Sequence, residues 1–308
     1  MAHFTIHNTT PPRDFQILSF SWRGSGHRAR EEQKQDYCDY RDLGPFGIVA
    51  VVSDGVGSCP RSREGAESVV QTSLDTIEEA ILSGINILEA PANHWKAWIG
   101  TSIERNRKKL TRLLEEPDSE FSSERKIREL FSATQLLAWT DGRSLVTSIV
   151  GDGAIIGVSH DDSGNLKFVD LVDVDKQGMA NEVVPVTLPN WERGWLFRGP
   201  ENCTSFEGVI LATDGFSDSA GEAFWRYLWE SLITAPPKSS GEEERTTNTE
   251  TISQPETTEP APAPATPPRL PESHRKDSRE EFLQAFAKEL ESRGYSSDDK
   301  TIIVVRFL

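Results

Sequence analysis

The sequence of 308 residues predicts an α+β fold in which β-sheets pack together and helices cover them. Short apolar runs typical of buried strands follow one another along the chain. Helical patterns come in pairs rather than between successive strands, and no repeat of fixed period is present. Consecutive strands with paired helices favour an α+β sandwich over a regular βαβ alternation.

The apolar runs predict strands in the order 15–22, 46–53, 133–139, 144–150, 154–158, 166–172, 208–212 and 301–307. Apolar residues at helical spacing predict helices at about 66–81, 95–114, 219–233 and 282–290, and Gly294 ends the last of these. The final strand is a continuous apolar run, so we expect it to lie inside the main sheet.

One segment differs in composition from the rest. Half of the 18 prolines fall within residues 236–271, and this stretch has no aromatic residue. It cannot bury enough apolar surface to offset the entropy of ordering it, so we expect a disordered Pro/Glu/Thr-rich insertion at about 236–276. Too few residues follow for a second core, so residues 14–308 are expected to form one domain after a flexible segment, 1–13.

The chain carries 33 basic and 49 acidic side chains, a net charge of −16. This balance argues against nucleic acid and membrane surfaces as partners, because both carry negative charge. The start of the chain lacks the features of a secretion signal, and the three cysteines are too widely spaced for a disulfide framework or a zinc ribbon. We expect a cytoplasmic monomer.

Aspartates recur where apolar strands end or begin. The segments are Asp54-Gly55, Gly151-Asp152-Gly153, Asp214-Gly215 and Asp298-Asp299. A single Asp-Gly after a strand is usually a plain turn, but several together favour a shared site. Carboxylates gathered at one sheet edge repel, so they raise their pKa values or bind cations. Oxygen ligands suit Mg²⁺ or Mn²⁺, and two such ions about 3.5–4 Å apart support hydrolysis of phosphate esters.

At these residues the sequence resembles the metal-dependent PPM-type serine/threonine phosphatases, the protein phosphatase 2C superfamily, and within it the bacterial-type branch. The ordered motifs span nearly the whole chain and begin with Arg23-Gly24-Ser25-Gly26-His27, Gln35-Asp36 and Val52-Ser53-Asp54-Gly55-Val56-Gly57-Ser58. They continue with Ser62-Arg63-Glu64-Gly65-Ala66, Ser132-Ala133-Thr134, Val150-Gly151-Asp152-Gly153, Leu211-Ala212-Thr213-Asp214-Gly215 and Asp298-Asp299-Lys300-Thr301.

The resemblance implies an αββα sandwich with two central antiparallel sheets flanked by helices. It implies that Asp54 bridges two Mn²⁺ or Mg²⁺ ions and that the Gly55 carbonyl is also a ligand. Asp214 and Asp299 would hold the first ion. Asp36 would hold the second, and Asp152 would help to bind a third. The expected catalytic set is therefore Asp36, Asp54, Asp214 and Asp299, and the expected partner is a phosphorylated protein.

Three positions depart from the family's pattern. Lys34 stands where an Asn or Glu is usual, and Val56 stands where animal members have a general-acid histidine. The segment Gly151-Asp152-Gly153-Ala154 replaces a frequent Gly-Asp-Ser-Arg. The phosphate-contacting arginine has no unique counterpart, so Arg23, His27 and Arg28 are all candidates.

The leading hypothesis is a protein phosphatase that hydrolyses phosphoserine and phosphothreonine by attack of a hydroxide bridged between two ions. One alternative is a catalytically degenerate relative that binds a phosphorylated partner. Another is an aspartyl-phosphate phosphatase centred on Asp173, because Asp173-Val174-Asp175 follows a predicted strand. Gln177 does not fit that second alternative.

Overall fold

A computed structural model describes residues 14–114, 120–172, 184–217, 221–234, 284–285, 287–289, 291–292 and 297–308. The expected flexible segment 1–13, the expected insertion at 236–276 and Asp173 lie outside these residues. The helix expected at 282–290 is described only in part, and Ala287 from it is buried in the core.

Ten strands and six α-helices make up the described architecture. The strands are β1 (Phe15–Trp22), β2 (Tyr37–Asp42), β3 (Ile48–Ser53), β4 (Gln135–Thr140), β5 (Ser144–Val150), β6 (Ala154–His160), β7 (Leu166–Asp170), β8 (Trp195–Asn202), β9 (Phe206–Ala212) and β10 (Lys300–Phe307). The helices are α1 (Ser25–Ala29), α2 (Ser62–Leu82), α3 (Ala92–Arg112), α4 (Glu120–Phe131), α5 (Asp214–Ser217) and α6 (Glu222–Thr234).

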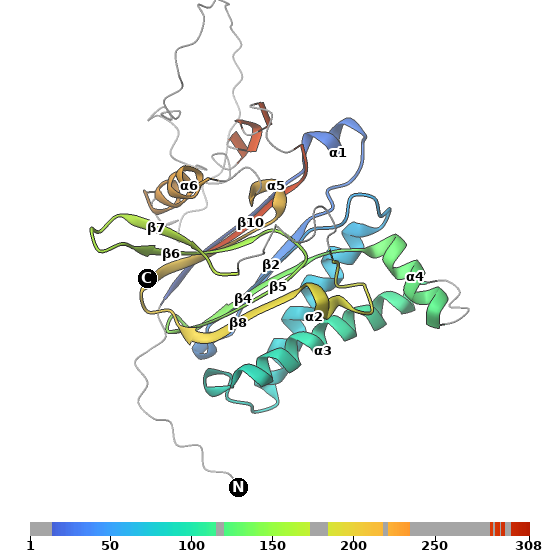
Figure 1. Cartoon of the computed structure of the whole chain (residues 1–308), viewed down its shortest axis with the longest axis horizontal. Helices are drawn as coiled ribbons and strands as arrows, with labels where there is room; N and C mark the ends of the chain where they lie inside the picture. Colours follow the sequence, from blue (N-terminus) through green and yellow to red (C-terminus); the bar gives the residue numbers. More distant parts are fainter. Residues whose placement is uncertain are drawn as a thin grey trace, which may run out of the picture.

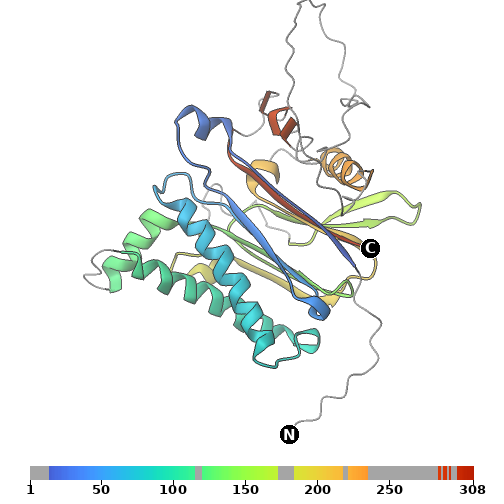
Figure 2. The same cartoon turned by 180° about the vertical axis from the view of Figure 1, so that it is seen from behind.

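The strands form two five-stranded antiparallel sheets that face each other (Figure 1). The first sheet has the order β1-β10-β9-β6-β7, and the second has the order β2-β3-β4-β5-β8. Helices α2 and α3 cover the outer face of the second sheet, and α6 covers that of the first (Figure 1 and Figure 2). The molecule is therefore the αββα sandwich that the sequence predicts.

Side-chain alternation along the strands explains these layers. In β3, Val49 and Val51 pack against α2 and α3, whereas Ala50 and Val52 face the opposite sheet. A strand buried on both faces needs apolar residues at every position, so β3 reads as a continuous apolar run. The same holds for β10, which lies between β1 and β9 in the first sheet.

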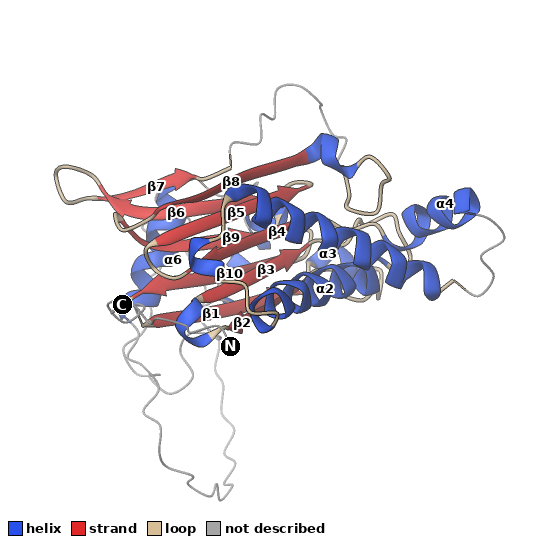
Figure 3. Cartoon of the chain, turned by 90° about the horizontal axis from the view of Figure 1, so that it is seen from below, coloured by secondary structure: helices blue, strands red, loops and turns tan. Residues whose placement is uncertain are grey.

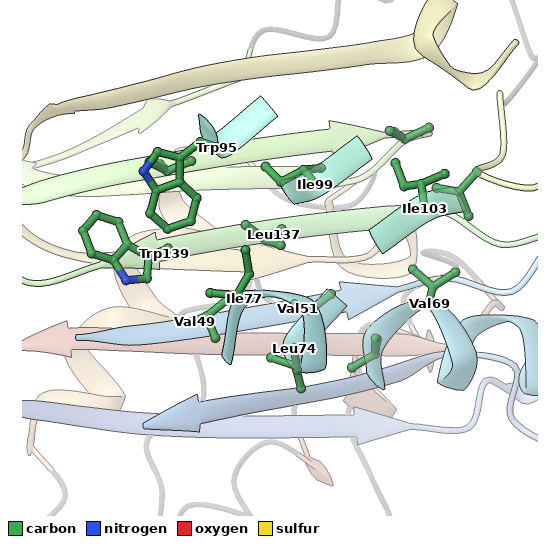
Figure 4. Close-up of a cluster of buried hydrophobic side chains, with 14 of the residues drawn as sticks. Val49, Val51, Val69, Leu74, Ile77, Trp95, Ile99, Ile103, Leu137 and Trp139 are labelled. Carbon is green, nitrogen blue, oxygen red and sulfur yellow. The ribbon is translucent and has the colours of Figure 1, made fainter. Parts of the chain in front are cut away.

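The helical layer on the second sheet is held by large apolar side chains. Figure 3 shows α2 and α3 lying over the strands, and Figure 4 shows the side chains that they bury. The ring centroids of Trp95 on α3 and Trp139 on β4 are 4.7 Å apart, and both side chains are fully buried. Leu74 and Ile77 of α2 pack into the same cluster at the spacing of one helix face. No helix in the described part of the chain is long and apolar enough to cross a bilayer.

Two strands, β2 and β8, and three helices, α1, α4 and α5, were not predicted. Strands β2 and β8 are the edges of the second sheet, and their residues are only partly buried or exposed. Edge strands need fewer apolar residues, and β8 contains Gly199-Pro200, which sequence patterns assign to a turn. Helix α4 has few apolar residues, and Ile127 and Phe131 pack it onto Leu110.

Candidate metal centre

The expected site residues lie at one end of the sandwich, because the strands that carry them end or begin there. Tyr37 at the start of β2 pairs with Ser53 at the end of β3, so the antiparallel register places Asp36 beside Asp54. Ala212 at the end of β9 pairs with Ala154 at the start of β6 and, on its other side, with Ile302 near the start of β10. Residues before β2, β6 and β10 therefore meet residues after β3, β5 and β9.

Three of the aspartates converge on one another. The carboxylates of Asp54, Asp152 and Asp214 each offer an oxygen, and these atoms all lie within 4.8 Å of one another. All three side chains are partly exposed, so solvent reaches the cluster. Asp152 sits between Gly151 and Gly153, whose φ angles of 109° and 105° belong to a backbone shape that glycine adopts readily. Loops after three different strands thus bring three carboxylates together.

Asp36 is the buried member of the site. Its side chain is 1% exposed, and its Oδ2 accepts a hydrogen bond of 2.9 Å from the Thr213 hydroxyl. Its Oδ1 is also buried and has no hydrogen-bond donor among the described residues. Burial, with the charge of Asp299 adding to it, raises the pKa of Asp36 to about 6. Burial and then the charges of Asp36 and Asp214 raise the pKa of Asp54 well above its usual range. The surroundings of Asp36 and Asp54 therefore disfavour the ionised form of both carboxyl groups.

Close backbone contacts fix the two Asp-Gly turns. The Asp54 N–H donates to the Thr134 hydroxyl at 2.9 Å, and the Thr134 N–H donates to the Asp54 carbonyl at 2.8 Å. A Cβ on Gly55 would lie 2.8 Å from the Gln35 carbonyl oxygen. A Cβ on Gly215 would lie 1.8 Å from the carbonyl oxygen of Asp299, so only glycine fits there.

Asp299 occupies a different position from the other expected ligands. Its Oδ1 accepts a hydrogen bond of 2.7 Å from the Gly24 N–H, and its Oδ2 accepts one of 2.5 Å from the Gln35 N–H. His27 Nδ1 lies 2.9 Å from the same Oδ1, and Asp299 is 1% exposed. The neighbouring Asp298 is 48% exposed, and its charge contributes to the raised pKa of Asp54. The structure therefore directs the Asp299 carboxylate into the protein and leaves that of Asp298 beside the cluster.

The three candidate phosphate contacts lie in and before α1. His27 is 3% exposed and lies against Asp299. Arg28 forms an ion pair with Glu291 and stacks over the Trp22 ring. Arg23 donates from Nη2 to the His27 carbonyl at 3.0 Å and is partly exposed. Of the three, Arg23 alone combines partial exposure with no acidic partner among the described residues.

Sequence reasoning did not assign a role to Arg63 or Lys34. Arg63 on α2 donates to the carbonyls of Lys34 and Asp36 at 3.3 Å and 3.2 Å, and its guanidinium lies over the Tyr37 ring. It thereby holds the segment that carries Asp36. Arg63 belongs to the motif beginning at Ser62, but a motif match does not indicate which residue it contacts.

The residues present fit divalent cations. The donor set is made of carboxylate oxygens, Asp36 Oδ1 is buried without a donor in the described part of the chain, and the pKa values of Asp36 and Asp54 are raised. A hard cation such as Mg²⁺ or Mn²⁺ would stabilise the ionised form of these carboxylates.

Comparison with solved structures supports the fold. A serine/threonine phosphatase 2C from Toxoplasma gondii matches with a TM-score of 0.55 and 15% identity, over 97% of this chain and 96% of that one. A serine/threonine phosphatase from Staphylococcus aureus matches with a TM-score of 0.54 and 12% identity, over 100% and 99% of the two chains. One from S. agalactiae matches with a TM-score of 0.52 and 15% identity, over 96% and 100%.

Among curated proteins, no sequence matches this chain. A family model described as protein phosphatase 2C matches residues 23–245, which is most of the chain and includes Asp36, Asp54, Asp152 and Asp214. Together with the two-sheet sandwich and the convergent carboxylates, this match establishes that the chain belongs to the protein phosphatase 2C family of protein phosphatases.

Proposed function

We propose that this protein hydrolyses phosphoserine and phosphothreonine in protein substrates, using Mn²⁺ or Mg²⁺. The observation that carries the proposal is the convergence of Asp54, Asp152 and Asp214 within 4.8 Å, next to the buried Asp36. Membership in the protein phosphatase 2C family supports the reaction class. The similar structures from S. aureus and S. agalactiae are serine/threonine phosphatases, which supports a phosphoprotein as the substrate.

Each aspartate has a proposed place in this site. Asp54 and Asp214, with the Gly55 carbonyl, hold the first ion, and Asp36 and Asp54 hold the second. Asp152 contributes to a third. We propose that Asp298 takes the role expected for Asp299, because both Asp299 oxygens already accept backbone N–H groups. Arg23 is the proposed phosphate contact.

Divalent ions in such a site supply an activated water as the nucleophile and neutralise the charge of the phosphate. The chain's own residues do the positioning. Thr213 and Arg63 orient Asp36 and the backbone that carries it, and Thr134 holds the Asp54 backbone. No side chain of the protein forms a covalent bond with phosphorus in this proposal, in contrast to an aspartyl-phosphate phosphatase.

The experiment measures hydrolysis of p-nitrophenyl phosphate and of a phosphothreonine peptide with Mn²⁺, with and without EDTA. Wild type is expected to be active only with metal, and Asp214→Ala is expected to lose activity by about a thousandfold or more. The matched control is Asp162→Ala, an exposed aspartate in the turn between β6 and β7, which should retain full activity. Turnover in EDTA, or full activity of Asp214→Ala, contradicts the proposal. Tight phosphopeptide binding without turnover in any metal supports the degenerate alternative.

A further inference from the structure

A cationic side chain, that of Lys34, lies near the carboxylates of Asp36 and Asp299. Lys34 is partly buried, and its ammonium donates a hydrogen bond of 2.5 Å to the Ser21 hydroxyl. It has no ion-pair partner at contact distance among the described residues. Burial and the charge of Arg63 lower the pKa of Lys34, whereas the charges of Asp36 and Asp299 favour its ionised form. The Lys34 ammonium therefore lies near two carboxylates but forms its hydrogen bond to a neutral hydroxyl group.

A chain of hydroxyl groups connects Lys34 to Asp36. Ser21 Oγ lies 2.5 Å from Thr301 Oγ1, and the Thr301 side chain hydrogen-bonds to the Asp36 carboxyl. Because an ammonium group can only donate, Ser21 accepts from Lys34 and is free to donate to Thr301, which in turn donates to Asp36. Hydrogen bonds in such a chain polarise one another in the same direction. The Lys34 charge therefore acts on Asp36 through this chain as well as through space.

The other cations near the cluster are engaged elsewhere. Lys300 is fully buried, donates to the Asp298 carbonyl at 2.9 Å and lies 3.9 Å from the Glu291 carboxylate. The Arg63 guanidinium bonds to carbonyl oxygens and lies over Tyr37. Lys34 is thus the cation whose hydrogen bonds lead to the Asp36 carboxyl.

We propose that Lys34 is an internal counter-charge for the carboxylate cluster, and that it stabilises the metal-free protein while weakening the binding of divalent cations. Lys34 touches no substrate in this proposal and acts as a positioning residue through Ser21, Thr301 and Asp36. The physical basis is that one positive charge and a divalent cation compete for the same carboxylates. The inference rests on the proposed function, since it presumes that the cluster binds such ions.

The test compares Lys34→Gln, Lys34→Met and Lys34→Arg with wild type in the full chain. Mn²⁺ affinity is measured by titration calorimetry, and melting temperature is measured in EDTA and in saturating Mn²⁺. The two neutral variants are expected to bind Mn²⁺ about three- to tenfold more tightly than wild type and to melt at a lower temperature in EDTA. Lys34→Arg, which keeps the charge, should bind Mn²⁺ like wild type. Lys167→Gln, on the exposed side of β7, controls for loss of a lysine charge far from the site.

A purely structural role for Lys34 would weaken stability and Mn²⁺ affinity together, so the opposite signs distinguish the two roles. Equal or weaker Mn²⁺ binding by both neutral variants, with wild type binding normally, overturns this inference and leaves the proposed function intact. Failure of wild type itself to bind Mn²⁺ overturns the proposed function and this inference with it. If one neutral variant does not fold, the other gives the same comparison.

Discussion

His27 Nδ1 lies 2.9 Å from Asp299 Oδ1, and both side chains are buried. The same carboxylate accepts the N–H groups of Gly24 and Gln35. One aspartate therefore joins three segments: the turn after β1, the first helix, and the residue before Asp36. Asp299 therefore holds together the segments at the end of the sandwich that carries the carboxylate cluster, whatever ion the neighbouring carboxylates bind.

Replacing Asp299 with alanine should destabilise the protein by about 3 kcal/mol, because the N–H groups of Gly24 and Gln35 would lose their acceptor and the contact with His27 would be lost. Urea unfolding in EDTA measures this loss. Asp298→Ala is the matched control: its exposed side chain predicts a stability change under about 1 kcal/mol but weaker Mn²⁺ binding, by about tenfold or more. The reverse pattern, with Asp299→Ala stable but unable to bind Mn²⁺, would return the ligand role to Asp299.

The metal-free protein should lose stability as pH rises through the range set by Asp36. Its pKa is raised from 3.8 to about 6 by burial, so in that interval the folded protein holds a proton that the unfolded chain has released. The favourable contribution is complete below 3.8 and disappears as pH passes about 6, and the raised pKa of Asp54 extends the loss upward.

Melting temperatures in EDTA at about pH 5 and about pH 8 test this dependence. Asp36→Asn removes the titrating group, so between these two pH values the variant should lose less stability than wild type, by about 1–1.5 kcal/mol. Saturating Mn²⁺ should restore the wild type at the higher pH, since a bound cation replaces the proton. An identical pH dependence in wild type and Asp36→Asn would contradict the expectation.

Gly215→Ala should destabilise the protein by about 3 kcal/mol or more and should also reduce phosphatase activity. The added Cβ would lie 1.8 Å from the Asp299 carbonyl oxygen, so β9 and β10 would have to separate where Asp214 begins α5. The comparison variant is Gly221→Ala, where nothing lies within 4 Å of an added Cβ. Thermal unfolding and Mn²⁺-dependent turnover of both variants decide the matter. Equal stability of the two would show that this close contact is not required.

Thr213→Val should lower stability by about 1–3 kcal/mol, because the Thr213 hydroxyl donates to Asp36 and accepts the Thr301 N–H at 3.0 Å. Thr213→Ser keeps the hydroxyl and should stay within about 1 kcal/mol of wild type. Denaturant titration of the pair measures the difference. If serine costs as much stability as valine, the methyl group contributes as much as the hydroxyl bond, and the prediction is wrong.

The buried strands and the aspartate cluster could be predicted from the sequence because their patterns are strong and local. A run such as residues 48–53 is apolar at every position, and an aspartate at its end can only lie at the sheet edge. Strands β2 and β8 escaped prediction because an edge strand is identified by its partner and not by its own composition. The different surroundings of Asp298 and Asp299 depend on backbone N–H groups about 265 to 275 residues away, which no local pattern reveals.

The two sheets differ in the length of chain that each needs to close. The second sheet is built from residues 37–202 and brings together strands that mostly follow one another. The first sheet is complete only when β10 lies between β1 and β9. The pairing of β1 with β10 joins residues almost 300 positions apart. Loop closure over that distance is entropically costly and slow. During synthesis, the half of the site that carries Asp36, Asp54 and Asp152 can therefore assemble early, whereas the ion-binding end becomes complete only with the last strand.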